Sequence, residues 1–187
     1  MDNDIAILHL QQAGLTKADI NQLACMGYFT APASKGHHLA KEGGLVEHSI
    51  NVKTHLVNMT AALGVTWPRA ESPALVGMLH DVVKCKCYRL RADGSGYDYQ
   101  QPEYPGHGVA SVMIIAVELG IYLYPEEAAA ITWHMGAFGL VGRELGEFDA
   151  ALARWPRHII ATHTADWYAA RVVESGDWSA EREVHHA

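Results

Sequence analysis

Cysteine is scarce in this chain of 187 residues, and its copies are poorly arranged for cross-linking or for binding zinc. The three cysteines are Cys25, Cys85 and Cys87, an odd number without a Cys-x-x-Cys pair. Disulfide frameworks and zinc ribbons both need paired cysteines, so the pattern favours neither. We expect reduced thiols, as is usual for cytoplasmic proteins.

Long hydrophobic runs are also missing. The N-terminal residues Met-Asp-Asn-Asp lack the basic start and apolar stretch of a signal peptide. The longest apolar stretch, residues 109–123, is interrupted by Ser111, Glu118 and Gly120. It is shorter than the roughly 18 residues that suggest a membrane span. We therefore expect a cytoplasmic protein without membrane contact.

Positive charge is in deficit. Lys and Arg total 14 against 21 Asp and Glu, which gives a formal net charge of −7. Proteins that bind long nucleic acid through its phosphates usually carry a basic surplus. The composition therefore argues against long duplex nucleic acid as a partner. A single nucleotide or a short oligonucleotide still agrees with it, because a local basic pocket suffices for these ligands.

Apolar residues recur at helical spacing through most of the chain, so we predict an all-α helical bundle. The expected helices span residues 4–14, 16–27, 45–63, 72–87, 108–119, 125–134, 150–155 and 156–174. Thr16 followed by Asp19 predicts a capping box. A small hairpin is expected within the loop 88–100, and residues 136–148 are expected to be irregular.

The length favours a single domain over residues 1–187. We expect N-terminal helices in residues 1–30 and a functional core in residues 31–175. Residues 176–187 read as a flexible tail.

Histidine is abundant, with twelve copies, and one of them sits beside an acid in an apolar segment. His80 and Asp81 lie within Ala74–Lys84, which is otherwise almost wholly apolar. Burying an imidazole beside an ionisable carboxyl is costly without partners. A divalent cation supplies a partner, because imidazole nitrogen and carboxylate oxygen suit Mn, Fe, Co, Ni or Zn. Neighbours on a helix diverge by about 100°, so the pair can straddle a metal site with Asp81 bridging two ions.

Further residues of metal-binding type recur along the chain. His48 follows Gly-Gly-Leu-Val-Glu, His107 lies between two glycines at a predicted helix start, and His134 ends a helix in Trp-His-Met-Gly. Asp166 lies in the last predicted helix. Each of these residues alone is more often a core or surface residue, so the weight lies in the ordered set.

The order His, His-Asp, His, His, Asp resembles the HD superfamily of metal-dependent phosphohydrolases. The resemblance covers residues 28–175 and is closest to small phage and bacterial HD proteins with the Gly-Gly-Leu-x-Glu-His, Leu-His-Asp, Gly-His-Gly and Trp-His-Met-Gly blocks. The pair His37-His38 is similar to a feature of the HD domain of 3′–5′ exoribonucleases. The resemblance implies an HD-domain helical bundle that cleaves a phosphoester by a metal-activated hydroxide.

The resemblance also implies the ligand sets. A first divalent ion would be held by His48, His80, Asp81 and Asp166. A second ion would be held by Asp81, His107 and His134. Members with the first four ligands alone work with one metal, so the two additional histidines favour two ions here. The alternative is that His107 or His134 binds substrate phosphate.

Three residues are candidates for supporting roles. Lys84 follows Asp81 by three residues and shares its helix face. The resemblance gives Lys84 a catalytic role in neutralising phosphate charge or a nucleophile; a solvated or carboxylate-paired lysine is the alternative. Glu47 would orient the imidazole of the adjacent histidine ligand. His163 would act similarly in the last helix, with an ordinary helix histidine as the alternative.

Substrate contacts are expected from two places. Lys35, His37 and His38 lie on the loop that enters the first ligand helix, a position suited to phosphate. Trp133 would stack a base, unless it belongs to the core. Arg143 would clamp a phosphate, although a surface position explains it as well.

Three functions fit these residues. The first is a phosphohydrolase acting on a nucleotide or short oligonucleotide, which agrees with the absence of a Gly-x-Ser-x-Gly elbow or a catalytic cysteine signature. The second is a di-iron oxygenase, because some HD proteins use the same six ligands for that reaction. The third is a non-catalytic nucleotide sensor. The resemblance further suggests a homo-oligomer.

Overall fold

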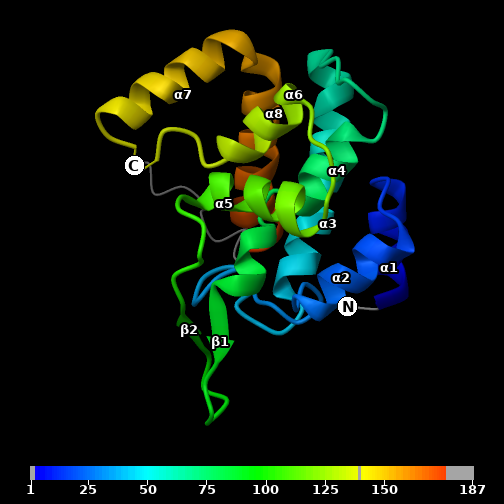
Figure 1. The fold of residues 1–187 in the computed structure, drawn as a ribbon, viewed down its shortest axis with the longest axis vertical. Coiled ribbons are helices and arrows are strands. Elements are labelled where there is room, and N and C mark those ends of the chain that lie inside the picture. Colours follow the sequence, from blue (N-terminus) through cyan, green and yellow to red (C-terminus); the bar gives the residue numbers. More distant parts are fainter. Residues whose placement is uncertain (1–2, 139, 176–187) are drawn as a thin grey trace, which may run out of the picture.

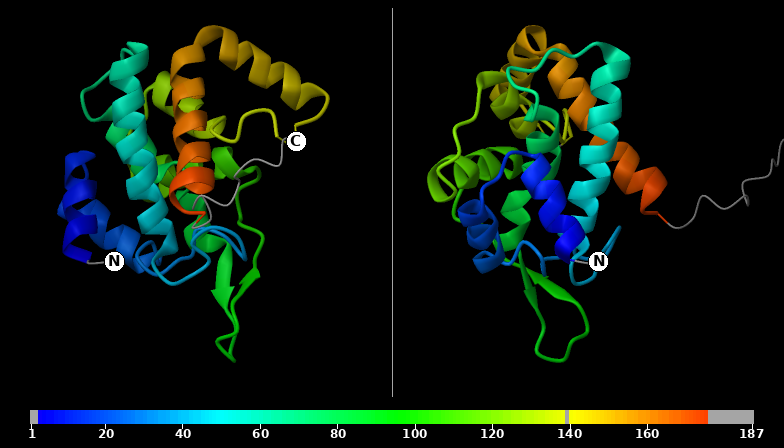
Figure 2. Two further views of the ribbon diagram at one scale, coloured as in Figure 1. Left: turned by 180° about the vertical axis from the view of Figure 1, so that it is seen from behind. Right: turned by 90° about the vertical axis from the view of Figure 1, so that its right-hand side faces the viewer.

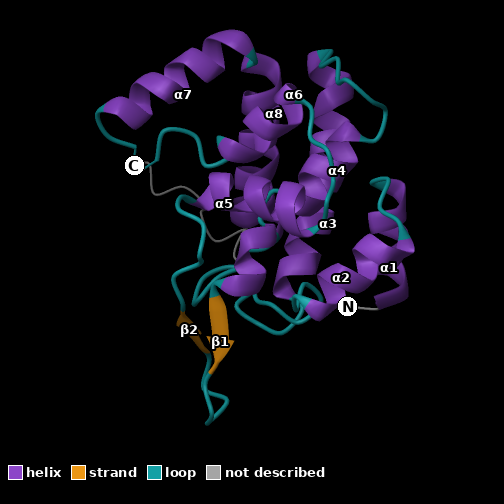
Figure 3. Cartoon of the chain, viewed as in Figure 1, coloured by secondary structure: helices purple, strands orange, loops and turns teal. Residues whose placement is uncertain are grey.

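The structure is a computed structural model that describes residues 3–138 and 140–175. Within these residues the chain forms eight α-helices and one two-stranded antiparallel hairpin (Figures 1 and 3). The predicted all-α class with a small hairpin is confirmed. No helix in the described part has the length and hydropathy that a bilayer crossing needs. The predicted tail, 176–187, lies outside the described residues.

The elements are joined by connections of very different length, the longest being residues 26–43 between α2 and α3. In chain order they are α1 (Asn3–Gln12), α2 (Lys17–Cys25), α3 (Gly44–Leu63), α4 (Ser72–Leu79), the 3₁₀ helix η1 (Val82–Lys86), β1 (Tyr88–Leu90), β2 (Tyr97–Tyr99), α5 (His107–Met113), the π-helix η2 (Ile114–Glu118), α6 (Pro125–Thr132), α7 (Arg143–Arg154), α8 (Pro156–Tyr168) and the π-helix η3 (Ala169–Val173). The predicted capping box of Thr16 and Asp19 is present at the start of α2. The hairpin projects from the helical body (Figure 1).

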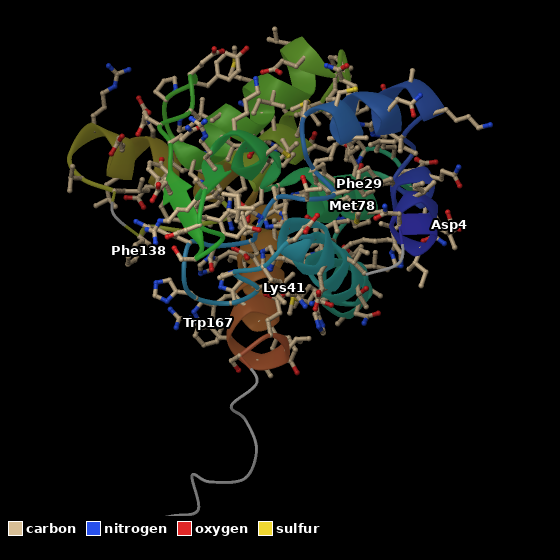
Figure 4. All side chains as sticks on the ribbon, turned by 90° about the horizontal axis from the view of Figure 1, so that it is seen from below. Asp4, Phe29, Lys41, Met78, Phe138 and Trp167 are labelled. Carbon is tan, nitrogen blue, oxygen red and sulfur yellow. The ribbon has the colours of Figure 1, made fainter. Side chains whose placement is uncertain are left out.

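The longest helix, α3, packs lengthwise against α4 and α8 (Figure 2). Helix α6 packs on α8 and α5, while α1 covers α4. Apolar side chains from these helices form one contiguous core, which includes the fully buried Leu45, Leu56, Met78, Ile115 and Ile131. Figure 4 shows Met78 in the interior. Each such side chain contributes about 1.5–3 kcal/mol through burial.

Helices α3 and α4 approach closely at Gly77. A Cβ atom at this position would collide with the backbone of Lys53 on α3, so only glycine fits the crossing. The close approach sets the end of α4 against α3. As a result the ring centroids of His48 on α3 and His80 after α4 lie 5.3 Å apart.

The helix predicted over residues 72–87 is wrong in its length, because α4 ends at Leu79. Asp81 adopts φ −110° and ψ 16°, which leaves the α-helical region, and the 3₁₀ helix η1 follows. The N–H of Val83 donates to Oγ of Ser111 at 3.3 Å. The apolar periodicity of the sequence continues past Leu79. The α-helix nevertheless ends there, and a tertiary contact to Ser111 holds the backbone that follows.

The irregular segment predicted over 136–148 and the short helix over 150–155 are also wrong. Helix α7 begins at Arg143 and runs unbroken to Arg154. The glycines Gly142 and Gly146 obscure its start in the sequence. Nε of Arg143 donates to Oε1 of Glu147 at 2.8 Å, an i, i+4 pair that supports the first turn.

Candidate metal centre

Separate parts of the chain converge on one cluster of imidazoles and carboxylates. The cluster consists of His48 from α3, His80 and Asp81 after α4, His107 at the start of α5, His134 after α6, and Asp166 from α8. Four of its members are at most 2% exposed: His48, His80, Asp81 and His134. The structure thus brings together all six residues that the sequence suggests as metal ligands.

Asp81 lies at the centre of the cluster, and its two oxygens face different histidines. Oδ2 lies 3.6 Å from Nε2 of His48 and 3.4 Å from Nε2 of His80. Oδ1 contacts Nε2 of His107 and lies 3.4 Å from Nε2 of His134. A carboxylate between two imidazole pairs has the arrangement that a bridge between two cations requires.

Asp166 completes the side of the cluster that contains His48 and His80. Its Oδ1 lies 3.1 Å from Nε2 of His48 and 3.8 Å from Nε2 of His80. Ligand atoms of His48, His80 and Asp81 fall within 4.8 Å of one another, as do those of Asp81, His107 and His134. The geometry therefore offers two overlapping sets of donors that share Asp81.

Three of the four histidine nitrogens that face the centre make no hydrogen bond within the described residues. Nε2 of His48, His80 and His134 is buried and makes no hydrogen bond within the described structure. Nδ1 of His80 donates to O of Gly77 at 2.9 Å, and Nδ1 of His134 donates to O of Ile131 at 2.6 Å, in the tautomer that leaves a lone pair on Nε2. Metal-bound histidines are oriented in this way. Unpaired buried groups cost about 1–3 kcal/mol each, so the cluster fits a divalent cation.

Gly108 brings His107 beside His134. A Cβ atom at position 108 would collide with O of Thr132 and lie 2.6 Å from O of Ile131. Without a side chain, the first turn of α5 abuts the end of α6. The ring centroids of His107 and His134 are consequently 5.3 Å apart.

Glu174 orients His48, a role that the sequence did not reveal. Both carboxylate oxygens of Glu174 lie 3.0 Å from Nδ1 of His48, and Nδ2 of Asn51 donates to Oε1 at 2.9 Å. The prediction that Glu47 orients this imidazole is wrong, because Glu47 pairs with Lys41 at 2.8 Å. A carboxylate behind a histidine ligand fixes its tautomer and raises its basicity.

The π-helix η3 directs Glu174 toward the same side as Asp166. On a regular α-helix, an advance of eight residues from Asp166 to Glu174 would turn the two side chains about 80° apart. The wider π turns of η3 wind the backbone more slowly and reduce that angle. A π turn leaves no clear mark in the sequence, so spacing alone does not point to Glu174.

The carboxylates keep the cluster strongly polarised. Burial lowers the pKa of His48, but the neighbouring carboxylates of Asp166 and Glu174 outweigh it and raise the pKa to about 9. Burial also opposes ionisation of Asp81, yet the ammonium group of Lys84 and neighbouring imidazoles hold its pKa well below the usual value. Asp81 is therefore an anion near neutral pH, as a metal ligand must be.

Two other residues singled out from the sequence support the cluster from its edge. Nζ of Lys84 lies 2.5 Å from Oδ2 of Asp81, so Lys84 is paired with a carboxylate, which was the alternative expectation for it. The side chain of Lys84 is 12% exposed. Nδ1 of His163 donates to O of His134 at 2.7 Å, so His163 holds the backbone of a candidate ligand.

The loop residues expected to bind substrate divide into two groups. His38 lies beside the cluster, with Nε2 3.9 Å from Oε2 of Glu174 and its ring centroid 5.1 Å from that of His48. Lys35 and His37 are exposed on the same loop. His38 is therefore the best placed of the three to meet a ligand at the cluster.

The two candidates near α7 differ as well. Trp133 is half-buried and lines a cavity, and it packs edge-on against Phe148 with the two ring centroids 5.6 Å apart. Arg143 is 91% exposed and pairs with Glu147, so its guanidinium group is engaged on the surface of α7. The structure thus places Trp133, but not Arg143, on the wall of a hollow near the cluster.

The described chain is mostly helical and contains a buried cluster of His and Asp that is suited to a metal ion. Comparisons with protein-family models, curated proteins and solved structures found no match. A functional assignment therefore rests on the residues and geometry of the cluster.

Proposed function

We propose that this protein is an HD-type metal-dependent phosphohydrolase that cleaves a phosphoester in a nucleotide or short oligonucleotide. The position of Asp81 carries the proposal, because its two oxygens face two separate histidine pairs. The unpaired Nε2 atoms support it independently. The order of the residues along the chain, which resembles the HD superfamily, agrees with the same function.

Two divalent ions fit the donors, with Mn, Fe, Co, Ni and Zn as candidates. The first ion would be held by His48, His80, Asp81 and Asp166. The second would be held by Asp81, His107 and His134. Such ions, when bound, lower the pKa of a water molecule and stabilise charge on a phosphoryl group.

The chain's own residues define how a phosphate approaches. His107 has a side chain 35% exposed and Asp166 one 17% exposed, while the other members of the cluster are almost fully buried. A substrate therefore reaches the cluster past these two side chains. Lys84 holds a positive charge next to Asp81 and attracts the phosphate. His38 offers a further donor at the rim.

The same proposal covers location and organisation. Cys25, Cys85 and Cys87 are free thiols, which agrees with the cytoplasm. Residues 1–187 would form one HD domain that assembles as a homo-oligomer, with a nucleotide as its ligand.

A metal and product assay on wild-type protein, Asp81→Ala and Asp98→Ala tests the function. Asp98 is a control carboxylate on the exposed hairpin. Metal content is measured first, and then the release of phosphate or nucleoside from mono-, tri- and cyclic nucleotides and short RNA or DNA with added Mn, Co, Ni or Zn. We expect wild-type and Asp98→Ala proteins to bind metal and release product, and Asp81→Ala to do neither.

Two results would contradict the proposal. Bound metal without product from any of these substrates would exclude the phosphohydrolase and leave the nucleotide sensor. Iron-dependent oxygen consumption would instead identify the oxygenase.

A further inference from the structure

A cavity of about 340 Å³ lies beside the metal centre, between α5, the end of α6 and α7. Its size falls within the range of about 300–1,000 Å³ that is usual for small-molecule sites. His107 forms part of its wall, so the cavity and the cluster share one side chain. Figure 1 shows how α7 extends over this part of the molecule.

The cavity wall offers flat and apolar surfaces. Trp133, Met135 and Phe138 all contribute to it. Phe138 is 84% exposed, and Figure 4 shows it at the outer edge of the molecule. Aromatic side chains gain most when another ring covers them. An exposed aromatic ring at the mouth of a cavity is thus placed to stack on a ligand.

The charge of the wall excludes a phosphate as its occupant. Apart from His107, the ionisable side chains among the described lining residues are the acids Glu144 and Glu147 of α7. A phosphate would be repelled by these carboxylates, whereas N–H groups of a ring would donate to them. Arg143 engages Oε1 of Glu147 at 2.8 Å, which leaves Oε2 and the Glu144 carboxylate as acceptors.

We infer that this cavity binds the base of a nucleotide, and specifically a base that carries an exocyclic amine, while the phosphoester lies at the metal centre across His107. Trp133 and Phe138 supply ring faces, and the two glutamates accept hydrogen bonds from the amine. Adenine and cytosine present an amino group where thymine and uracil present a carbonyl oxygen, which the carboxylates repel. The inference rests on the proposed phosphohydrolase function.

Calorimetric titration of the full chain with cytidine, uridine and ribose 5-phosphate tests the inference, with and without added Mn²⁺. We expect cytidine to bind more tightly than uridine. Phe138→Ala should weaken cytidine binding about 5- to 150-fold, the usual effect of losing a stacking partner. Glu144→Gln should bring the affinities for cytidine and uridine closer together. Both side chains are exposed, so neither change disturbs the core.

The matched control is Val141→Ala. Val141 is 72% exposed and lies near Phe138 in the chain, but it is not part of the cavity wall. Equal affinities for cytidine and uridine in the wild type, or equal losses in Phe138→Ala and Val141→Ala, would overturn the inference. Displacement of cytidine by ribose 5-phosphate in metal-free protein would overturn it too, because the cavity would then accept phosphate.

The nucleosides contain no phosphoester, so the two proposals fail separately. Cytidine binding with the expected preference, but without hydrolysis of any substrate, would leave the cavity assignment and remove the phosphohydrolase. Hydrolysis without any preference among the bases would do the reverse.

Discussion

Helices α4 and α6 each contribute to two buried polar clusters, one near their first residues and one just beyond their last. Near the first residues, Glu127 of α6 meets Ser72 of α4 and Arg69 shortly before α4. Beyond the last residues, Asp81 lies opposite His134. Both clusters therefore centre on a buried carboxylate between the same two helices.

The carboxylate of Glu127 is fully provided with donors. Arg69 donates from Nε at 2.7 Å and from Nη2 at 2.8 Å, Oγ of Ser72 donates at 2.6 Å, and the N–H of Tyr124 donates at 2.9 Å. Glu127 is 0% exposed. A buried acid with every oxygen engaged serves the fold, because it joins the starts of two helices.

The cluster around Asp81 is equally buried but incomplete. Three imidazole nitrogens face its carboxylate without a hydrogen bond in the described structure. The two carboxylates are thus buried to a similar degree, and the supply of hydrogen-bond partners in their clusters differs. The contrast teaches that unpaired donors and acceptors, more than burial itself, distinguish a binding site from a stabilising ion pair.

Asp81→Asn should cause the largest loss of metal affinity and turnover, and this loss should arise in the cluster around Asp81 alone. Removing a residue that hydrogen-bonds to a metal ligand usually lowers metal affinity about 10- to 100-fold. Loss of the shared ligand itself should therefore lower metal affinity and turnover by more than about 100-fold. Metal titration and product release measure both quantities. If Asp81→Asn retains metal as well as the control Asp98→Asn does, the cluster around Asp81 is not the metal site.

Glu127→Gln should act on the complete cluster alone. Arg69 would lose its charged partner, so we expect the free energy of unfolding to fall by about 2–4 kcal/mol. Urea denaturation measures this loss, and Glu126→Gln in the same turn of α6 is the control. Metal affinity should stay unchanged, and a large fall in it would show that the two clusters are not separate.

Removing metal with a chelator should distinguish the roles of the two clusters, because it should lower the free energy of unfolding only through the cluster around Asp81. Metal at a concentration 100 times its dissociation constant adds about 2.7 kcal/mol to the free energy of unfolding, and a chelator removes this contribution. The wild-type protein and Glu127→Gln should show the same loss in thermal unfolding with and without a chelator. Asp81→Asn should show none; a loss of equal size there would place the metal elsewhere.

Glu174→Ala should weaken metal binding about 10- to 100-fold, because His48 loses the acceptor that fixes its tautomer. Glu174→Gln retains an acceptor and should recover part of this loss. Nitrogen NMR of the His48 ring, recorded beside metal titration, reports the tautomer directly. An unchanged tautomer in Glu174→Ala would assign Glu174 a purely structural part.

Asn51→Ala should have the smallest effect of the series. It removes one hydrogen bond to Glu174, two steps away from the proposed ion. One such bond is worth about 0.5–1.5 kcal/mol, so metal affinity should fall about 2- to 10-fold. A loss as large as that of Glu174→Ala would mean that Asn51 does more than steady the carboxylate.

The sequence led to the six clustered residues because they follow one another in a distinctive order, and the histidines stand in short patterns such as Gly-His-Gly or Leu-His-Asp. Residues that act through distant contacts carry no such pattern. Glu174 reaches His48 across 126 positions and through a π-helix, and Glu127 reaches Arg69 across 58 positions. The sequence pattern likewise does not predict the end of α4 at Leu79, because only tertiary contacts mark it.

His107 belongs at once to the cavity wall and to the candidate ligands. A group in the cavity that favours one orientation of this imidazole changes the affinity for a cation. Thermodynamic reciprocity then requires the cation to change the affinity of that group by the same factor. Through this one side chain, binding of a group in the cavity and binding of a cation at the cluster are coupled.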